Sequence, residues 1–403
     1  MVWDFVKIGD VCKTGAGGTP LKSRKEYYEG GTIPWLLSGE VAQGEIHKSE
    51  TFITQTGLDN SSAKIFPVNT VLVAMYGATA GQVGILRCEA ATNQAVCGIL
   101  PNSNFVPEFL FYAMLSKQAE LISTATGNAQ PNISQIKVKN TIIPLPPLPE
   151  QKRIVAILDE AFAGIDAAVA NTEKNLANAR ELFESYLNAV FTQKGDGWVE
   201  KPVGEIADHC LGKMLDKRKN KGELKPYLRN LNVRWFDFDL TDLLEMKFEA
   251  GEVDRYSVRK GDVVICEGGY PGRAAIWPHD ETIYFQKALH RVRFKEPLHN
   301  RWLLYFLFLS DSNGYLKQFF TGAGIQHFTG KALKRFVLPI APTSEIERHL
   351  DRFEELHAET QRLEAIYQQK LSALAELKQS ILQKAFAGEL TALPEKEIEE
   401  AVA

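Results

Sequence analysis

The chain has 403 residues, of which 45% are hydrophobic and 24% are charged. This length is too great for one hydrophobic core and predicts two domains of ordinary size with a connecting element between them. The composition is typical of a soluble globular protein. The formal net charge of −4 at pH 7 does not indicate a nucleic-acid binder, but it does not exclude one, because acidic helices can lie beside basic faces.

The cysteines and the apolar runs exclude further classes of protein. The five cysteines are odd in number and form no C-x-x-C pair, which favours reduced thiols in a cytoplasm and argues against a zinc site. The longest apolar run, residues 302–309, is far too short to span a bilayer. Residues 1–4 contain no basic leader and no apolar core, so we expect no signal peptide and a cytoplasmic location.

The first 145 residues predict a mixed domain of strands and loops. Short β-branched and apolar runs alternate there with clusters of Gly, Pro, Asn and Ser, which is typical of strands joined by turns. One helix is predicted at residues 107–117, where Phe109 and Tyr112 would pack on the sheet. The predicted strands are residues 68–75, 82–86, 95–100 and 141–145.

A long helix is predicted after this domain. Consecutive prolines in residues 146–149 end the domain, because proline cannot enter a strand ladder or a helix interior. Residues 150–193 then contain no proline and one glycine, Gly164. Apolar residues recur there at alternating spacings of three and four, which indicates a heptad seam. The candidate inter-helix and partner-docking residues of this helix are Leu158, Phe162, Ile165, Val169, Leu176, Phe183 and Tyr186.

The second half of the chain repeats the same order of elements. Strands are predicted at residues 262–266, 273–277, 289–294 and 336–340, and a short helix at 300–310. A second long helix is predicted at residues 344–387, with Gly388 as its C-terminal stop. Its candidate inter-helix and docking residues are Leu356, Leu363, Tyr367, Leu374, Leu377 and Ile381.

These two halves align at an offset of about 195 residues. Trp3 returns as Trp198, and residues 126–145 return as 321–340 with matching Gly, Pro and apolar positions. A solenoid repeat would have a period of about 20–50 residues, so this period excludes a solenoid. It indicates a duplicated domain together with a duplicated connector.

The duplication predicts the architecture. A helix of about 40 residues spans roughly 60 Å and would leave its apolar stripe exposed to water unless it paired with the other copy. We therefore expect an α/β (α+β) protein with two similar globular domains, separated by a long antiparallel two-helix coiled coil and related by a pseudo-twofold axis. The expected segments are domain 1 (1–145), the central connector (146–197), domain 2 (198–340), the C-terminal connector (341–390) and an acidic tail (391–403).

Several segments resemble one known family. Residues 143–155 (IPLPPLPEQKRIV) and 377–390 (LKQSILQKAFAGEL) are similar to the conserved regions of specificity (S) subunits of type I restriction–modification systems. Residues 14–20 (TGAGGTP) resemble the opening of a target-recognition domain of that family, and 265–273 with 286–291 resemble a recurrent second domain. The second connector, residues 340–348, keeps its proline and the Glu-x-x-Arg pattern but lacks Glu-Gln-Lys-Arg. The resemblance covers nearly the whole chain.

The resemblance implies a division of labour. Each domain would read one half of a split double-stranded DNA target, and the helices would set the spacing and dock two modification (methyltransferase) subunits. S-adenosylmethionine, ATP and Mg would be bound by the modification and restriction (motor) subunits, whereas this chain would bind no cofactor and would not be catalytic. The residues agree, because the sequence contains no G-x-x-x-x-G-K-[ST], no Asn/Asp-Pro-Pro-Tyr/Phe and no metal-spaced His/Cys cluster.

Candidate DNA contacts in the first domain come from glycine turns and amide side chains. The turn at residues 15–20 with its following cations suits phosphate groups, or is a solvated surface turn. Asn and Gln at 93–94 suit the edge of adenine, or satisfy backbone groups within the sheet. The candidates are Gly17, Thr19, Lys22, Arg24, Lys25, Tyr76, Thr79, Asn93, Gln94, Asn128, Gln130 and Asn132.

In the second domain the candidate DNA contacts are mostly basic side chains. Between residues 213 and 234 the chain carries eight cationic side chains against two acidic ones. Such a run is either a solvated face or a phosphate-binding one, and arginines beside the glycine turn at 267–272 suit guanine unless they form salt bridges. The candidates are Lys213, Lys217, Arg218, Lys219, Arg229, Tyr270, Arg273, Lys287, Arg291 and His327.

The principal alternative is a coiled-coil scaffold with two ligand-binding heads that does not bind DNA. A stand-alone DNA-binding regulator is also open, whereas a fused restriction–methylation polypeptide would need a catalytic domain. An enzyme that uses Glu267 or His290 is disfavoured, because no set of nucleophile, base and orienting group is visible in the sequence.

Overall fold

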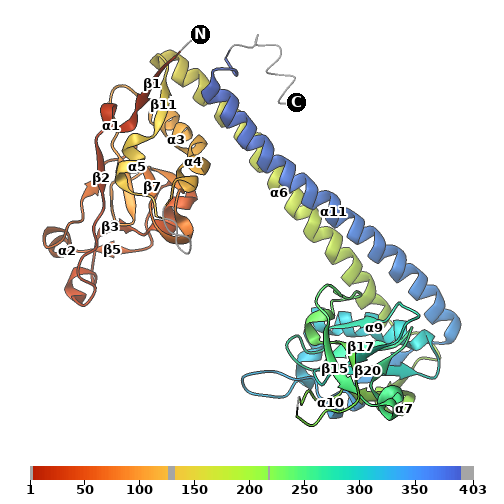
Figure 1. Ribbon diagram of the computed structural model, residues 1–403. Helices are drawn as coiled ribbons and strands as arrows, with labels where there is room; N and C mark the ends of the chain where they lie inside the picture. The colour runs from red at the N-terminus through yellow and green to blue at the C-terminus, as the bar shows by residue number, and fades with distance from the viewer. Residues whose placement is uncertain (1–2, 126–131, 217, 392–403) are drawn as a thin grey trace. The chain divides into compact units, whose positions relative to one another are not determined.

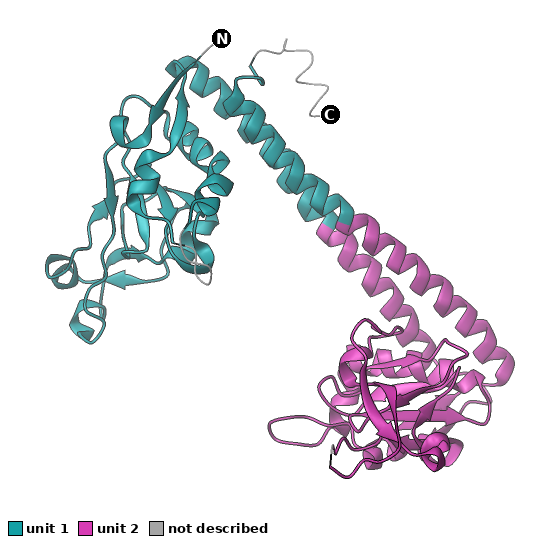
Figure 2. Ribbon diagram, in the orientation of Figure 1, with its two compact units in different colours: residues 1–172, 369–403 teal, residues 173–368 magenta. Residues whose placement is uncertain are grey.

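The computed structural model describes residues 3–125, 132–216 and 218–391. The chain divides into two compact units (Figure 2): residues 1–172 with 369–403 form unit 1, and residues 173–368 form unit 2. Each unit contains a mixed α/β domain and part of two long helices, α6 (Leu148–Thr192) and α11 (Thr343–Ala387) (Figure 1). The predicted fold class, two like domains with paired long helices, is confirmed.

The core of unit 1 is a five-stranded sheet in the order β2-β10-β7-β8-β4. Its inner strands are apolar runs that are buried on both faces, and α3 (Pro107–Ser116) packs against them with Phe109 and Leu110 buried. Pro107 suits the first helical position, where no backbone N–H is needed. The strands are β2 (Thr14–Ala16), β4 (Glu45–Ile46), β7 (Val71–Ala74), β8 (Val83–Leu86) and β10 (Val96–Ile99).

A second sheet of unit 1 has the order β5-β3-β9-β6, in which β3 and β9 are parallel. A separate antiparallel ribbon joins β1 to β11 with Phe5 opposite Pro144. These strands are β1 (Asp4–Lys7), β3 (Ile33–Leu36), β5 (Phe52–Ile53), β6 (Ile65–Phe66), β9 (Ala90–Thr92) and β11 (Ile142–Leu145); the short helices are α1 (Ile8–Val11), η1 (Lys25–Tyr27), η2 (Ser38–Gln43), α2 (Gln55–Asp59), η3 (Gly77–Thr79), α4 (Gln118–Ser123) and α5 (Gln135–Asn140).

Unit 2 repeats this topology with sheets β13-β20-β17-β18, β15-β14-β19-β16 and β12-β21. Its strands are β12 (Val199–Pro202), β13 (Ala207–Leu211), β14 (Glu223–Leu228), β15 (Leu244–Phe248), β16 (Ser257–Val258), β17 (Val263–Cys266), β18 (Ala274–Ile276), β19 (Ile283–Phe285), β20 (Leu289–Phe294) and β21 (Val337–Ile340). Its helices are α7 (Val203–Ile206), η4 (Asn230–Asn232), η5 (Ala250–Glu252), α8 (Val253–Tyr256), α9 (Leu298–Ser312), η6 (Tyr315–Phe319) and α10 (Gly330–Arg335).

The correspondence between the domains extends to single hydrogen bonds. In unit 1 the carbonyl of Met75 accepts from the N–H of Ile133 (2.8 Å), and in unit 2 the carbonyl of Glu267 accepts from Phe328 (2.7 Å). Both bonds tie the end of a central strand to the loop before the last helix. The bonds therefore align the two domains residue by residue, with Met75 matching Glu267.

The long helices pair within each unit. In unit 1, Leu158, Phe162 and Ile165 of α6 are buried, and the Lys378 ammonium of α11 lies 2.9 Å from the Asp166 carboxylate. The helix begins earlier than predicted, at Leu148, and takes Pro149 into its first turn, where a proline costs no hydrogen bond.

In unit 2 the pairing is antiparallel. The α6 residues Arg180 and Tyr186 contact Glu364 and Phe353 of α11, so the partner's number falls as the α6 number rises. Leu187 and Phe353 are buried among the seam residues, although the predicted seam omitted both. In unit 1, Leu377 is 44% exposed, so it stays a predicted partner-docking residue and is not part of the buried seam.

Candidate nucleic-acid interface

In unit 1 four segments from distant parts of the sequence meet at one end of the five-stranded sheet. The loop after β2 reaches this end through the N–H of Gly17, which donates to Val96 (3.1 Å). The N–H of Met75, just after β7, donates to Ala95 (2.7 Å), and Tyr76 forms a β-bridge with Asn132. Candidates from residues 17–19, 76–79, 93–94 and 132 therefore share one edge, as the antiparallel order of β2, β10 and β7 requires.

The glycines of the first loop have a structural role in place of the phosphate-binding role that was predicted for Gly17. A Cβ atom on Gly17 would lie 2.1 Å from the Thr92 hydroxyl, and one on Gly18 would lie 2.3 Å from the Ala63 nitrogen. The Gly18 N–H donates to Thr92 (2.9 Å), as the Gly17 N–H donates to Val96. Both amides are used inside the protein, so they hold the two sheets together and are not available to phosphate.

A polar side chain of this loop, Thr19, meets one from the loop after β9, Gln94. The Thr19 hydroxyl donates to the side-chain oxygen of Gln94, although the two residues are 75 positions apart. The side-chain oxygen of Asn93 accepts from the Ala95 N–H (3.1 Å), so it satisfies backbone, which was the open alternative for this residue. Gln94 is exposed and Thr19 half-buried, and they remain as a pair that can face a base edge.

Tyr76 and Thr79 lie in the turn after β7. The Tyr76 side chain is 39% exposed, and Gly77 has a φ of 73°, which lets the chain reverse directly after this ring. The Thr79 hydroxyl donates to the Tyr76 carbonyl (3.3 Å). The ring therefore stands at the sheet end on a tight, hydrogen-bonded turn.

Other predicted residues of unit 1 are not drawn to this edge by a contact. Lys22, Arg24 and Lys25 are exposed on the segment that leads into η1, where Arg24 pairs with Glu26 (3.4 Å) and Lys25 with Glu29 (3.8 Å). Exposed pairs of this kind are weak, so the three cations are free to contact phosphate. Asn128 and Gln130 lie outside the described residues.

Unit 2 assembles the same edge from different residues. The N–H of Gly212 donates to Leu289 (3.0 Å), as Gly17 donates to Val96. The N–H of Glu267 donates to Ala288 (2.7 Å), and Gly268 forms a β-bridge with His327. Lys287, which precedes Ala288, is exposed at this edge.

Two predicted cations of unit 2 are structural, which corrects their predicted contact with DNA. The Lys213 ammonium is buried, 2.5 Å from Glu252, and also donates to a backbone carbonyl (3.0 Å). The Arg291 guanidinium is 3% exposed; it pairs with Asp208 (2.6 Å) and donates to backbone carbonyls of residues 254–257. A buried cation is stabilised by ion pairs and hydrogen bonds inside the protein, and both side chains are held by such contacts.

The remaining basic run is exposed. Arg218 and Lys219 lie in a turn where the Asp216 carboxylate accepts from both backbone N–H groups (3.0 and 3.2 Å). This Asx-type turn directs the two side chains to solvent and leaves them available to phosphate. Lys217 lies outside the described residues.

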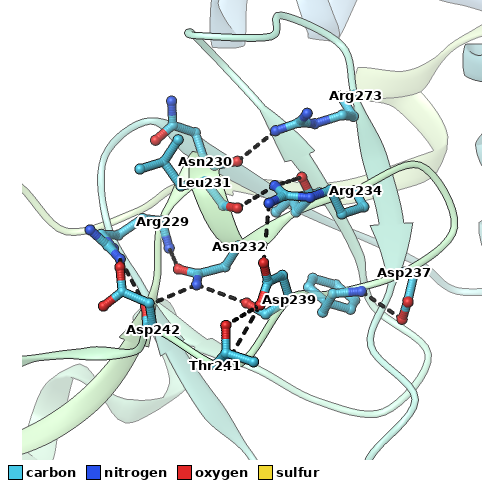
Figure 3. Close-up of polar contacts among 12 residues, drawn as sticks. Arg229, Asn230, Leu231, Asn232, Arg234, Asp237, Asp239, Thr241, Asp242 and Arg273 are labelled. Carbon is cyan, nitrogen blue, oxygen red and sulfur yellow. Dashed lines mark hydrogen bonds and ion pairs between the residues drawn. The ribbon is translucent and has the colours of Figure 1, made fainter. Parts of the chain in front are cut away.

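The loop that follows Arg229, which the sequence pattern did not single out, forms a closed network of polar contacts (Figure 3). The Asn232 side chain accepts from the Arg229 N–H (2.9 Å) and donates to the carbonyls of Asp239 (2.9 Å) and Asp242 (3.1 Å). The Arg229 guanidinium pairs with Asp242 (2.6 Å), and Arg234 pairs with Asp239 (3.2 Å). Arg229 therefore closes the loop, and its charge is already partly neutralised.

The start of this loop holds the side chain of Arg273, which is half-buried at this edge. The Arg273 guanidinium donates to the Asn230 carbonyl (2.9 Å; Figure 3) and lies 4.0 Å from the ring centre of Tyr270. The Asn230 side chain donates to the Gly268 carbonyl (3.2 Å), which joins the network to the β-bridge with His327. Tyr270 is 58% exposed. In the sequence, Asn230 could have been noticed as one of two asparagines, Asn230 and Asn232, that closely follow Arg229.

Two titratable groups beneath this edge are buried in the core. His290 is fully buried; burial lowers its pKa to about 4, and its Nε2 lies 3.0 Å from the Phe328 carbonyl. Burial likewise raises the pKa of the Cys266 thiol to about 11. Both groups are neutral at pH 7, which matches a role in the core. Across residues 3–125, 132–216 and 218–391, no group of His, Cys, Asp and Glu side chains is placed to hold a metal ion.

These features define a class of protein: one recognition domain present twice, with paired long helices and a different polar edge in each copy. Residues 2–176 and 195–373 match the family model described as type I restriction modification DNA specificity domain. The chain therefore belongs to the family of type I restriction–modification specificity subunits. None of the helices in the described part of the chain is long and apolar enough to cross a membrane.

Curated relatives carry the same description. The chain is 25% identical to the type I restriction enzyme EcoKI specificity subunit of Escherichia coli strain K12, in a match covering 97% of this chain and 89% of the relative. It is 30% identical to the MjaIX specificity subunit of Methanocaldococcus jannaschii, over 51% of each chain. The chain spans about half the length of that relative and 48% of the EcoR124I/EcoR124II specificity subunit of Escherichia coli, with 25% identity.

Two solved structures share the fold. One chain, from work on complex assembly and conformational transition of the type I restriction–modification system, superposes with a TM-score of 0.79 at 21% identity and covers 96% of this chain and 98% of that chain. The HsdS subunit from Thermoanaerobacter tengcongensis gives a TM-score of 0.55 at 21% identity, with 96% and 97% covered. At this identity the likeness shows the fold alone.

Proposed function

We propose that this chain is the non-catalytic subunit that selects the DNA target of a type I restriction–modification complex. Each unit reads one half of a bipartite double-stranded target through the edge described above. The helix pair docks two modification subunits, which bind S-adenosylmethionine and methylate adenine. Restriction subunits, with ATP and Mg, join that core, while this chain binds no cofactor itself.

One observation carries the proposal: the same sheet edge is built twice from matched backbone bonds but with different side chains. Unit 1 presents Thr19, Gln94 and Tyr76, whereas unit 2 presents Arg273 and Lys287 at the corresponding edge. Two different half-sites require the same backbone arrangement in each unit but different side-chain hydrogen-bond donors. Amide side chains suit adenine and arginine suits guanine in the major groove.

Phosphate contacts come from exposed cations around the two edges. The exposed cations without strong ion pairs are Lys22 and Lys25 in unit 1 and Arg218, Lys219 and Lys287 in unit 2. Such contacts fix the register of a protein on the duplex without carrying sequence information. Their number sets the salt dependence of binding.

The test is to define the target and then measure binding to it. Methylome sequencing of cells that carry this chain with its modification subunits gives the methylated sequence, which we expect to be two half-sites around a fixed spacer. For the complex and that duplex, the logarithm of the association constant should fall linearly with the logarithm of the salt concentration. The slope should be about −0.9 for each phosphate contacted.

The purified chain alone should neither methylate nor cut DNA. The alternative, a scaffold that does not bind DNA, predicts no duplex binding at any salt concentration. That result, or methylation of DNA by the chain alone, would overturn the proposal.

A further inference from the structure

One backbone hydrogen bond in each domain identifies the residue of unit 1 that corresponds to Arg273. In unit 1 the N–H of Ala74, at the end of β7, donates to the Gln82 carbonyl (2.9 Å). In unit 2 the N–H of Cys266, at the end of β17, donates to the Arg273 carbonyl (2.8 Å). Each acceptor directly precedes the next strand, β8 or β18, so Gln82 stands in unit 1 where Arg273 stands in unit 2.

The turns before these two residues agree with this match. Gly81 and Gly272 both have a left-handed φ (86° and 89°), and their N–H groups donate to the last residue of β7 and of β17 (2.8 and 2.9 Å). The turn of unit 1 is one residue longer than that of unit 2. A constant offset of 195 residues would therefore align Gln82 with Trp277, and only the hydrogen bonds align it with Arg273.

Gln82 lies at the same end of the sheet as the candidate residues already described. β8 begins directly after it, β7 ends at Ala74 and β10 begins at Val96. These three strands are antiparallel neighbours in the order β10-β7-β8, so the starts of β8 and β10 lie beside the end of β7. Gln82 and Gln94 therefore share one edge of the sheet, on either side of β7.

The side chain of Gln82 points away from the main core of unit 1. Val83, the next residue, is buried in that core, and successive side chains along a strand point to opposite faces. Ala74, which lies opposite Gln82, packs with Leu36 of β3 and Val41 of η2. Residues directly opposite one another in antiparallel strands share a face, so the Gln82 side chain lies on the face that carries η2.

The side chain of Arg273 faces the corresponding element of unit 2. η2 and η4 begin in the same way, because the N–H of the residue before each helix donates to a side chain of its third residue, Glu40 (2.8 Å) or Asn232 (2.9 Å). The first residues of these helices, Ser38 and Asn230, therefore correspond. The Arg273 guanidinium donates to the Asn230 carbonyl (2.9 Å; Figure 3). The two side chains thus face matching elements.

The amide of Gln82 is free to make new hydrogen bonds. The side chain is half-buried, and within residues 3–125, 132–216 and 218–391 it makes no hydrogen bond. The Asn93 side chain at the same edge is used differently, since its oxygen accepts from the Ala95 N–H (3.1 Å). Gln82 therefore offers both a donor and an acceptor at the edge.

We propose that Gln82 is a specificity-determining residue of unit 1 and reads an A·T base pair in its half-site. This inference rests on the proposed function, in which the sheet edge of each unit reads one half-site. A glutamine amide can bond N6 and N7 of adenine, as an arginine bonds O6 and N7 of guanine. The two domains therefore differ in base preference at one matched position, where the same backbone carries Gln82 in one and Arg273 in the other.

The first experiment exchanges the side chain at this position in the full chain, produced with its modification subunits. Gln82→Arg should change one A·T pair of one half-site to G·C, because Ser38 occupies the place of Asn230, whose carbonyl holds Arg273. Methylome sequencing reads this change, and the other half-site should stay the same. A methylated target identical to that of the wild type would overturn the proposal.

The control Asn104→Arg makes the same charge change elsewhere in unit 1. Asn104 is exposed in the loop between β10 and α3, at the opposite end of β10 from Gln94. Both half-sites should stay unchanged in this variant. A change of target in Asn104→Arg as well would show that added charge, and not the position of Gln82, alters the preference.

The second experiment decides if Gln82→Arg does not fold or does not methylate. Gln82→Ala removes only the amide, since the bond to Ala74 is made by the backbone, and its circular dichroism should match that of the wild type. In competition binding with single-base-pair variants of the target, discrimination at one A·T pair should fall about tenfold. A merely structural role would weaken binding to all duplexes alike, and unchanged discrimination at every position would overturn the proposal.

The wild-type complex separates this inference from the proposed function. If the wild type prefers no duplex sequence, the proposed function fails and the assignment of Gln82 fails with it. If the wild type discriminates between duplexes and Gln82→Ala discriminates equally well, the proposed function stands and only the assignment of Gln82 is wrong.

Discussion

Under the proposed function, Arg273 is the residue of unit 2 that we expect to read a base. Its guanidinium is stacked on Tyr270 and held by the Asn230 carbonyl, so its orientation is fixed before DNA binds. A lysine keeps the charge but loses the planar fork and the stack. This makes Arg273→Lys a selective test of base reading as opposed to phosphate attraction.

We expect Arg273→Lys to weaken binding to the cognate duplex by about 1–3 kcal/mol and to relax discrimination at one base pair. Competition binding with single-base variants of the target measures both effects. The control is Lys260→Ala, which removes a cation at the opposite end of β17 and should leave discrimination unchanged. Loss of affinity without any change in discrimination would contradict a base-reading role.

His290 makes the stability of unit 2 depend on pH. Its pKa is about 4 in the folded state against an ordinary 6.5, because burial penalises the charged ring. Above pH 6.5 both states are neutral; between pH 6.5 and 4 only the unfolded state takes up the proton. The stabilisation is therefore present above pH 6.5 and lost as pH falls towards 4, by up to about 3 kcal/mol.

Replacing His290 with Gln removes this titration but keeps a donor for the Phe328 carbonyl. Urea denaturation at pH 7, 6 and 5 should show the wild type losing more stability than His290→Gln over this interval. Parallel profiles would show that the folded-state pKa of His290 is not depressed.

At the scale of elements, the helix pair of unit 2 depends on Phe353. This side chain is fully buried and its ring lies within 6 Å of the ring centres of Tyr186, Phe191, Trp302 and Tyr305. It therefore joins α6, α9 and α11 in one core. Phe353→Ala should destabilise the protein by about 3–5 kcal/mol, since the cavity it leaves can close only partly.

Urea denaturation followed by circular dichroism measures this loss. The control Glu355→Ala removes an exposed residue of the same helix and should change stability by no more than about 0.5 kcal/mol. A loss below about 1 kcal/mol for Phe353→Ala would show that the junction of the three helices does not depend on this ring.

Much of the fold at this scale was predictable from periodicity. The heptad spacing predicted α6 and α11 to within two residues at each end, and apolar runs predicted β7, β8, β10 and their counterparts. The second sheet of each unit was not predicted. In unit 1 its strands β3, β5, β6 and β9 have two to four residues each, too few for a periodic signal to stand out from the loops around them.

At the scale of the whole molecule, the two long helices should act as the ruler of the bipartite target. Inserting one heptad into both α6 and α11 adds about 10.5 Å of helix, close to the length of three base pairs. Under the proposed function the spacer between the half-sites should lengthen by about three base pairs while both half-sites stay the same. Methylome sequencing reads this directly, and an unchanged spacer would exclude the ruler.

The sequence by itself determined the duplication, the long helices and the family, because these depend on periodic and repeated patterns along the chain. Only the tertiary structure decided which candidates face outward. Arg291 and Lys213 look like Arg273 and Lys287 in the sequence, yet the first two are buried ion pairs and the others lie at the sheet edge. Burial and pairing depend on residues up to 83 positions away, which no local pattern encodes.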